Sequence, residues 1–162
     1  MGNTTLFITE KPSVAQEYRK VLNVQTKGKT DGYIEGFSQF INANVIITWA
    51  IGHLIGIAPP FVQNPAWKEW NTKNLPMIPE HFKYIPIEST AKQLKIVSSL
   101  YKRDDLSAIY YAGDSGREGI YIQALIRNYI FGGTPKNITE RVVWIDSFTE
   151  SEIKRGITQA KP

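Results

Sequence analysis

Residues 110–122 read Tyr-Tyr-Ala-Gly-Asp-Ser-Gly-Arg-Glu-Gly-Ile-Tyr-Ile, and the rest of the chain is arranged around them. The apolar run at residues 108–112 predicts a buried strand, and apolar residues at helical spacing predict a helix that continues to about residue 131. Between strand and helix lies a polar turn with carboxylates, a guanidinium and glycines. In an open α/β sheet, ligands bind at the carboxyl ends of the strands, so this turn predicts a metal or phosphate site.

The charged side chains of this turn allow two interpretations. Asp114 and Glu118 offer oxygen ligands, and Arg117 offers a fork of N–H donors for a phosphate. Alternatively, Asp114 caps the following helix, while Glu118 and Arg117 are ordinary first-turn surface charges. Three glycines, spaced three residues apart directly after the strand, favour the ligand site, because glycine permits close backbone approach.

A second charged turn follows the strand predicted at residues 6–9. Glu10 and Lys11 come directly after that strand, and Ser13 with Gln16 predicts a capping box that starts a helix at Ser13. Taken alone, Glu10 and Lys11 fit a solvated turn equally well. If both strands belong to one parallel sheet, however, Glu10 lies near the carboxylates of the first turn, and converging carboxylates are what a divalent cation requires.

The composition fits one domain with an ordinary core. The 162 residues are 42% apolar and 21% charged. The net charge of +4 and the pI near 9.2 are compatible with a nucleic-acid partner without requiring one. No cysteine is present, which excludes disulfides and thiolate metal sites. No apolar run approaches the ~20 residues that span a bilayer, and the N-terminus lacks a signal-peptide pattern, so we expect an intracellular protein.

The remaining sequence alternates strand and helix patterns. Such alternation predicts an α/β fold, with a mainly parallel sheet covered by helices on both faces. Further strands are predicted at residues 33–35, 37–41, 45–49 and 142–145. The other predicted elements are a polar loop at 23–30, a helix at 90–100, a helix end at 132–135, and a last helix capped by Thr149 with Glu152.

Two further stretches each allow two interpretations. Residues 59–86 are rich in proline and aromatic residues, and we expect Trp67 and Trp70 to pack this insertion onto the sheet edge rather than to stack on bases. His53 lies in a Gly-His-Leu step. It fits a structural role, because histidine is often partly buried, or a contact to a phosphate or to a metal shell.

Three landmarks occur in order along the chain: Thr-Glu-Lys-Pro-Ser at residues 9–13, Gly-His-Leu at 52–54 and Asp-Ser-Gly-Arg-Glu-Gly at 114–119. The ordered set resembles the Toprim domain of the type IA DNA topoisomerases, most closely the topoisomerase III branch. Supporting matches are residues 31–35, the Leu-Pro and Ile-Pro steps between residues 70 and 79, and residues 141–144 followed by Ser147 and Thr149. The resemblance covers almost the whole chain.

The resemblance implies a single Toprim domain over residues 1–162, with a four-stranded, Rossmann-like sheet, as the N-terminal fragment of a larger enzyme. Type IA topoisomerases cut one DNA strand through a tyrosine, pass a strand through the gap and reseal it. They need Mg²⁺ but no nucleotide cofactor. The implied partners are single-stranded DNA and the remaining topoisomerase domains, and the implied location is the cytoplasm, on chromosome or plasmid DNA, with no membrane association.

The resemblance also assigns roles to individual residues. By position, Glu10 matches the family's catalytic glutamate beside the scissile phosphate, and Lys11 matches its catalytic, phosphate-contacting lysine. Asp114 and Glu118 match the first aspartate and the glutamate of an Asp-x-Asp-x-Glu metal motif, with Glu10 as a further metal ligand. The residues assigned to DNA phosphates are Lys11, Arg117 and His53.

The sequence departs from the family pattern in three places. The second aspartate of the metal motif is Gly116 here, and the acid after the second glycine is Ile120. We therefore expect weaker Mg²⁺ binding, with Asp146 as a substitute ligand. None of the tyrosines matches the nucleophile, so the fragment alone is not expected to relax DNA. Two alternatives stay open: a catalytically impaired paralogue that acts as a DNA-binding module, and another Toprim enzyme such as a primase or nuclease.

Overall fold

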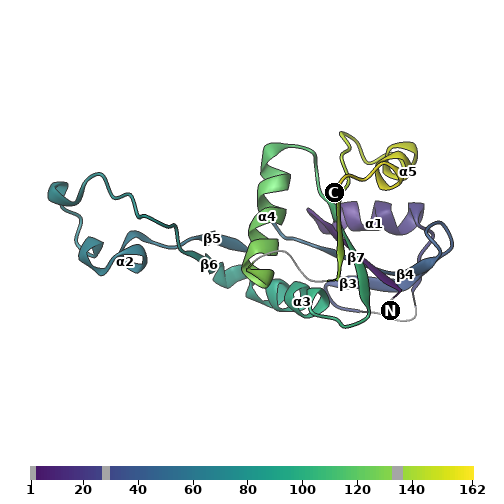
Figure 1. Cartoon of the computed structure of the whole chain (residues 1–162), viewed down its shortest axis with the longest axis horizontal. Coiled ribbons are helices and arrows are strands. Elements are labelled where there is room, and N and C mark those ends of the chain that lie inside the picture. Colours follow the sequence, from purple (N-terminus) through teal and green to yellow (C-terminus); the bar gives the residue numbers. More distant parts are fainter. Residues whose placement is uncertain (1–2, 27–29, 133–136) are drawn as a thin grey trace.

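The computed structural model describes residues 3–26, 30–132 and 137–162, which form a six-stranded sheet with strand order β2-β3-β4-β1-β7-β8 (Figure 1). The strands are β1 (Thr4–Thr9), β2 (Gln25–Thr26), β3 (Tyr33–Ser38), β4 (Ala43–Trp49), β7 (Leu106–Ala112) and β8 (Thr139–Val142). Strands β4, β1, β7 and β8 run parallel, whereas β3 pairs antiparallel with β4, and β2 pairs antiparallel with β3 at the edge of the sheet. The predicted α/β class with a mainly parallel sheet is confirmed, and the sheet is two strands larger than the four expected.

Helices cover both faces of this sheet. They are α1 (Pro12–Val21), α3 (Ala91–Tyr101), α4 (Arg117–Phe131) and α5 (Glu150–Thr158), with a short 3-10 helix, Glu88–Thr90, before α3. Successive strand residues point to opposite faces, so Leu6 and Ile8 of β1 pack with α3 and α4, while Phe7 packs with α1 and α5. All of β1 is buried, as expected for a central strand covered on both sides. No helix in the described part of the chain is long and apolar enough to cross a bilayer.

The start of α1 differs from its prediction. The helix begins at Pro12 with Lys11 as its N-cap residue, and no side chain caps it. The capping box predicted from Ser13 and Gln16 is therefore wrong. Proline suits the first helical position, because its missing N–H would have no partner there, and this moves the start ahead of Ser13.

The C-terminal boundaries also differ. Strand β8 ends at Val142, so the strand predicted at residues 142–145 is displaced, and Val143 and Ile145 are buried against α5 instead. Thr149 is the N-cap residue of α5, as predicted, but its side chain makes no cap bond. Beyond α5, Lys161 forms an isolated antiparallel bridge with Val142 at the outer side of β8.

Other predicted boundaries hold with small changes. The two strands predicted at residues 33–41 form one, β3, and the polar loop at 23–30 contains β2, with residues 27–29 outside the described part. Helix α3 keeps its predicted inward face of Leu94, Val97 and Leu100. Helix α4 ends at Gly132, whose φ of 63° favours glycine, and residues 133–135 of that predicted end are outside the described part.

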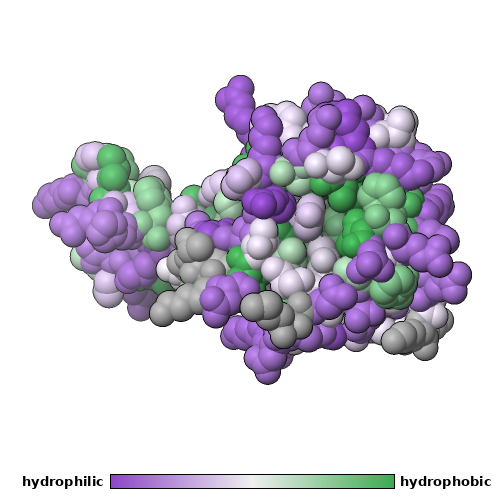
Figure 2. Space-filling view, turned by 45° about the vertical axis from the view of Figure 1, so that its right-hand side comes forward, coloured by the Kyte–Doolittle hydropathy of each residue, from purple (hydrophilic) through white to green (hydrophobic). Residues whose placement is uncertain are grey.

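Residues 55–86 form an arm that projects from the body of the domain (Figure 1). At its base, β5 (Ile55–Ile57) pairs antiparallel with β6 (Tyr84–Pro86). Beyond the base lie α2 (Pro60–Gln63) and the 3-10 helices Pro65–Trp67 and Thr72–Asn74. The expectation that Trp67 and Trp70 pack this segment on the sheet edge is wrong, because the Trp70 residue is 80% exposed. Figure 2 shows apolar residues at the surface of the arm.

Candidate functional site

The two charged turns meet at the carboxyl edge of the sheet. Strands β1 and β7 are parallel neighbours that pair Thr9 with Ala112, so the turns that follow them leave the sheet side by side. Together they line a pocket of about 260 Å³, called the carboxylate pocket below. Its lining residues are Glu10, Lys11, Gly52, Asp114, Gly116, Glu118, Gly119 and Ile122. The strand arrangement thus brings Glu10 together with Asp114 and Glu118, the two carboxylates of the turn after β7.

Close backbone packing shapes the turn between β7 and α4. Asp114 Oδ1 accepts a hydrogen bond of 3.1 Å from the backbone N–H of Gly116, the N-cap residue of α4. A Cβ atom placed on Gly119 would lie only 2.5 Å from the Asp114 carbonyl oxygen, so α4 can start this close to Asp114 only with glycine at that position. The first turn of α4 lines the pocket, and the partial positive charge of a helix N-terminus favours an anion there.

Two loose contacts between polar side chains lie at the carboxylate pocket. Lys11 Nζ lies 3.8 Å from Glu10 Oε1, and the Glu10 side chain is 28% exposed. His53 Nε2 lies 3.7 Å from Glu118 Oε1, and the His53 ring meets the Tyr121 ring edge-on. Both separations exceed hydrogen-bond length, so these contacts are weak and an incoming ligand can replace them.

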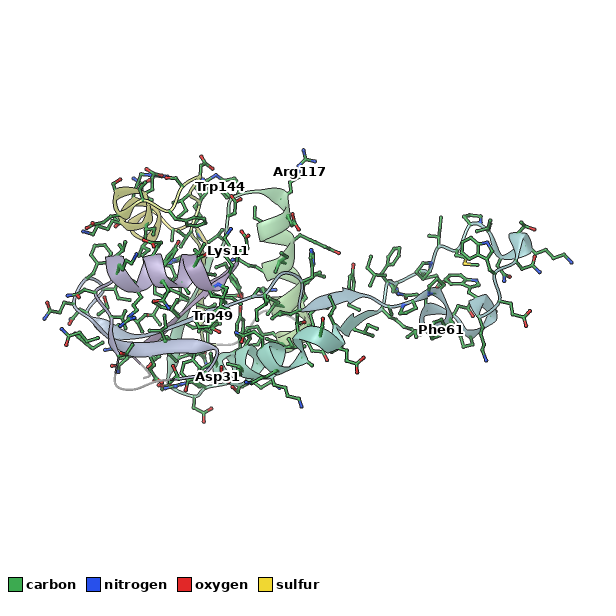
Figure 3. The ribbon with its side chains drawn as sticks, turned by 180° about the vertical axis from the view of Figure 1, so that it is seen from behind. Lys11, Asp31, Trp49, Phe61, Arg117 and Trp144 are labelled. Carbon is green, nitrogen blue, oxygen red and sulfur yellow. The ribbon has the colours of Figure 1, made fainter. Side chains whose placement is uncertain are left out.

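The structure does not bring every residue assigned to phosphate binding into the pocket. Lys11 lines it, whereas Arg117 is exposed at the start of α4 and projects away from the body (Figure 3). His53 lies beside the pocket through its contact with Glu118 rather than among the lining residues. A phosphate in the pocket would therefore meet Lys11 first, with Arg117 and His53 available to neighbouring parts of a longer ligand.

Comparison with known proteins identifies the family. A sequence model of the Toprim domain matches residues 5–146. The chain belongs to the Toprim family. It is 40% identical to DNA topoisomerase 3 of Staphylococcus epidermidis over 157 aligned residues. The aligned region is 97% of this chain and 20% of that protein. It is 38% identical over 158 residues to DNA topoisomerase 3 of Bacillus cereus, covering 98% of the chain and 20% of that protein. The chain spans about a fifth of the length of these relatives.

Asp146 of the Toprim domain lies next to the turn between β7 and α4 but outside the carboxylate pocket. Ser115 Oγ donates a 2.5 Å hydrogen bond to Asp146 Oδ1, and the Ser115 backbone N–H donates to the Ile145 carbonyl oxygen. These bonds hold Asp146 on the Ser115 side of the turn. Its role as a substitute ligand stays a prediction.

The donor chemistry of the pocket fits Mg²⁺. Across residues 3–26, 30–132 and 137–162, no three histidine or carboxylate side chains converge into a ready-made metal site. Mg²⁺ does not need one, because it usually takes one or two carboxylates and completes its octahedron with water and phosphate. Asp114, Glu118 and Glu10 offer such oxygens around the pocket, whereas Gly116 offers none. The magnesium site stays a prediction for these residues.

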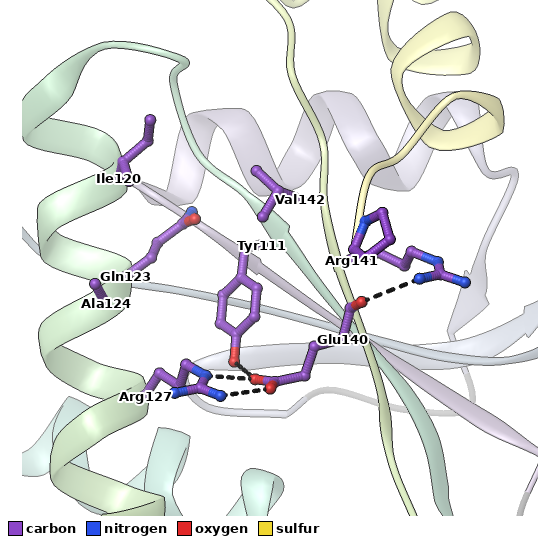
Figure 4. Close-up of a pocket in the computed structure, with 9 residues that line it drawn as sticks. Tyr111, Ile120, Gln123, Ala124, Arg127, Glu140, Arg141 and Val142 are labelled. Atoms are coloured by element: carbon purple, nitrogen blue, oxygen red, sulfur yellow. Dashed lines mark hydrogen bonds and ion pairs between the residues drawn. The ribbon is translucent and has the colours of Figure 1, made fainter. Parts of the chain in front are cut away.

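A second cavity, of about 210 Å³, lies between α4 and β8 (Figure 4). At this cavity, Arg127 forms two hydrogen bonds of 2.7 Å to the Glu140 carboxylate, and the Tyr111 hydroxyl donates to the same group. These bonds lower the pKa of Glu140, with Arg127 as the main cause, while burial raises the pKa of Tyr111. No motif in the sequence marks these three residues as a group, and their contacts tie α4 to β7 and β8.

Proposed function

We propose that this Toprim chain is the N-terminal part of a type IA, topoisomerase III-like DNA topoisomerase. In this proposal it supplies the acidic metal and phosphate site for cleavage and religation of one DNA strand, and the nucleophilic tyrosine lies in a domain beyond residue 162. The observation that carries the proposal is the convergence of Glu10, Lys11, Asp114 and Glu118 in one pocket. The names of the relatives, both DNA topoisomerase 3, support the same assignment.

Glu10 and Lys11 are proposed to act directly at the scissile phosphate. Lys11 places a positive charge on the phosphate oxygens, and its present distance of 3.8 Å from Glu10 leaves it able to turn to a stronger partner. Glu10 holds or moves a proton at the leaving oxygen, as a carboxylate within reach of the reacting group can. Its position directly after the buried strand β1 fixes its backbone, which limits the motion needed to reach the substrate.

Mg²⁺ is the proposed cofactor, held by Asp114, Glu118 and Glu10. When bound, the ion neutralises charge on the DNA backbone and fixes the broken 3′ end for religation. The chain's own contribution is to gather carboxylate oxygens at one edge of the sheet and to leave room for phosphate and water. Because Gly116 supplies no carboxylate, we propose weaker binding than a full acidic triad gives.

The proposed substrate is a single-stranded segment of DNA that extends beyond the pocket. Arg117 and His53 then contact other phosphates of the same strand. Arg117 suits this role because its exposed guanidinium can bind a phosphate with two parallel hydrogen bonds. No nucleotide cofactor enters the proposal, and the place of action is the cytoplasm, on chromosome or plasmid DNA.

The proposal is tested in the full-length protein by replacing Glu10 with alanine. Cleavage of single-stranded DNA, followed as covalent protein–DNA complex on a denaturing gel, should be abolished, because the variant lacks the carboxylate at the leaving oxygen. Glu17→Ala is the matched control, since Glu17 is a glutamate on α1 that forms an exposed ion pair with Lys20 and does not line the carboxylate pocket. Unchanged cleavage by the Glu10 variant would overturn the role given to Glu10.

One observation favours a second candidate function, a catalytically impaired Toprim paralogue that acts as a DNA-binding module. Gly116 occupies the position of a motif aspartate, and no ready-made set of three metal ligands is found in the described residues. The same experiment separates the two candidates. A full-length protein that binds single-stranded DNA but forms no covalent complex at any Mg²⁺ concentration is the module rather than the enzyme.

A further inference from the structure

The arm, residues 55–86, carries large apolar side chains that the rest of the described chain leaves partly or largely exposed. Within residues 59–86, all of which the structure describes, no residue is buried. The large apolar residues exposed there are Phe61, Val62, Trp70, Leu75, Ile78, Phe82, Tyr84 and Ile85. Trp70 and Ile78 are the most open, at 80% and 69% exposure. Soluble proteins rarely keep so many large apolar side chains together in water, so this surface marks a contact with another body.

The arm nevertheless has a built shape, which polar bonds maintain. Gln63 joins the two sides of the arm: its Nε2 donates to the carbonyl oxygens of Ala58 and Lys83, and its Oε1 accepts from the Lys83 backbone N–H. Near the tip, Asn71 accepts from the Lys73 N–H, and Asn74 donates to two backbone carbonyls. The backbone is thus ordered by amide side chains while the apolar side chains stay outside, so a partner meets a pre-organised surface.

The chemistry of the arm fits a polypeptide better than a nucleic acid. Half of the large apolar side chains exposed there, Val62, Leu75, Ile78 and Ile85, are aliphatic and have no ring on which a base can stack. The Lys83 ammonium is already occupied, because it donates to the carbonyl oxygens of Val62 and Gln63. The other arm lysines, Lys68 and Lys73, are accompanied by Glu69 and Glu80, so the arm has little net charge with which to hold phosphates.

We propose that the arm is the docking surface for the part of the same polypeptide that follows residue 162. This inference rests on the proposed function, in which further topoisomerase domains follow the Toprim domain. The two topoisomerase 3 relatives match 97–98% of this chain, arm included, yet the chain spans about a fifth of their length. A large body of polypeptide is therefore available in such a protein to cover the arm.

The arm is connected closely to the carboxylate pocket, so a polypeptide that docks on the arm is held at a fixed position relative to the pocket. Its first strand, β5, begins at Ile55, two residues after His53, which contacts Glu118 at the pocket. The other end of the arm leads from β6 through a short 3-10 helix into α3, which packs in the core. A polypeptide bound along the arm is thereby held in a fixed relation to the site where the scissile phosphate is proposed to lie.

The test is a photo-crosslink in the full-length protein. A benzoyl-phenylalanine placed at Ile78 should cross-link, on irradiation, to residues beyond 162 of the same molecule. Equal amounts of ¹⁴N- and ¹⁵N-labelled protein are irradiated together, so that mass spectrometry separates links within one molecule from links between two. The control carries the same group at Lys92, which is exposed on α3 outside the arm and should give few links of this kind.

Each outcome decides the proposal. Links from position 78 to later residues of the same molecule support it, whereas links between two copies, links to added single-stranded DNA, or no links at all overturn it. Trp70→Ser with Ile78→Ser should also lower the melting temperature of the full-length protein, while Lys73→Ser on the same arm should not. The covalent DNA complex is measured on the same samples. Cleavage without arm cross-links removes only the docking inference, and cross-links without cleavage remove only the proposed function.

Discussion

Gly119→Ala tests whether the turn before α4 depends on close backbone packing. The added Cβ would lie 2.5 Å from the Asp114 carbonyl oxygen and 3.2 Å from the Asp114 nitrogen. Both are backbone atoms of the turn, so relief requires α4 to move away from the pocket. Overpacking of this kind costs about 1–3 kcal/mol, and the better helix propensity of alanine returns at most about 1 kcal/mol. We expect a net loss of about 1–2 kcal/mol, which lowers the melting temperature by about 2–8 °C.

Gly116→Ser is the matched control in the same turn. Gly116 has φ −62° and ψ 153°, a conformation that any residue adopts, and its added Cβ would approach no atom closer than 3.5 Å. Serine is favoured at an N-cap position, so this variant should melt at the wild-type temperature or slightly above it. Thermal melts followed by circular dichroism compare the three proteins. If Gly119→Ala melts no lower than wild type, the close-packing argument is refuted.

Two further substitutions test other parts of the domain. Glu140→Gln should lower the free energy of unfolding at pH 7 by about 1–3 kcal/mol, because Arg127 keeps a neutral partner where it had a carboxylate. Folding lowers the pKa of Glu140, so the ionised carboxylate stabilises the folded state fully above its ordinary pKa of about 4.3, and this stabilisation is lost as the pH falls below that value. Urea unfolding measured between pH 7 and pH 3 should therefore show a smaller decrease in the free energy of unfolding for the variant than for the wild type. Gly116→Asp should tighten Mg²⁺ binding measured by calorimetry, since it restores a carboxylate to the pocket, and an unchanged affinity would contradict the missing-ligand argument.

The buried parallel strands could be predicted because their sequences leave few alternatives. Strands β1, β4 and β7 contain apolar runs between polar turns, and a strand covered on both faces has this pattern. Strand β2 could not be predicted, because its two residues are polar and exposed. They adopt strand conformation because they pair with β3. The strand predicted at residues 142–145 was misplaced, because the apolar residues after β8 are buried against α5, although the Val143 N–H still donates a hydrogen bond to the Tyr111 carbonyl oxygen.

The location of the candidate site could be predicted from the sequence, but the directions and contacts of its side chains could not. Glu10 and Asp114 follow adjacent strands closely, so the strand arrangement alone places them at one edge of the sheet. The outward direction of Arg117 depends on the orientation of the first turn of α4, which the residue types do not determine. The contact between Arg127 and Glu140 joins a helix to an edge strand and carries no motif that would have drawn attention to it.

The arm shows what composition leaves open. Its tryptophans and prolines led to the prediction that the segment packs on the sheet edge, and the exposure of Trp70 contradicts that prediction. Aromatic side chains carry large apolar areas, but a sequence does not say which body covers them. The same side chains therefore fit packing within a domain and packing against another one.

The bridge between Val142 and Lys161 has a practical consequence for preparing this domain. An uncovered edge strand offers unpaired N–H and C=O groups on which other molecules can assemble, which is a common origin of aggregation. Here the Lys161 N–H and carbonyl oxygen exchange hydrogen bonds of 3.0 and 2.7 Å with Val142, and so close part of the outer side of β8. Recombinant versions trimmed before this residue would lose that protection, and their solubility would then depend on how well the rest of the edge is shielded.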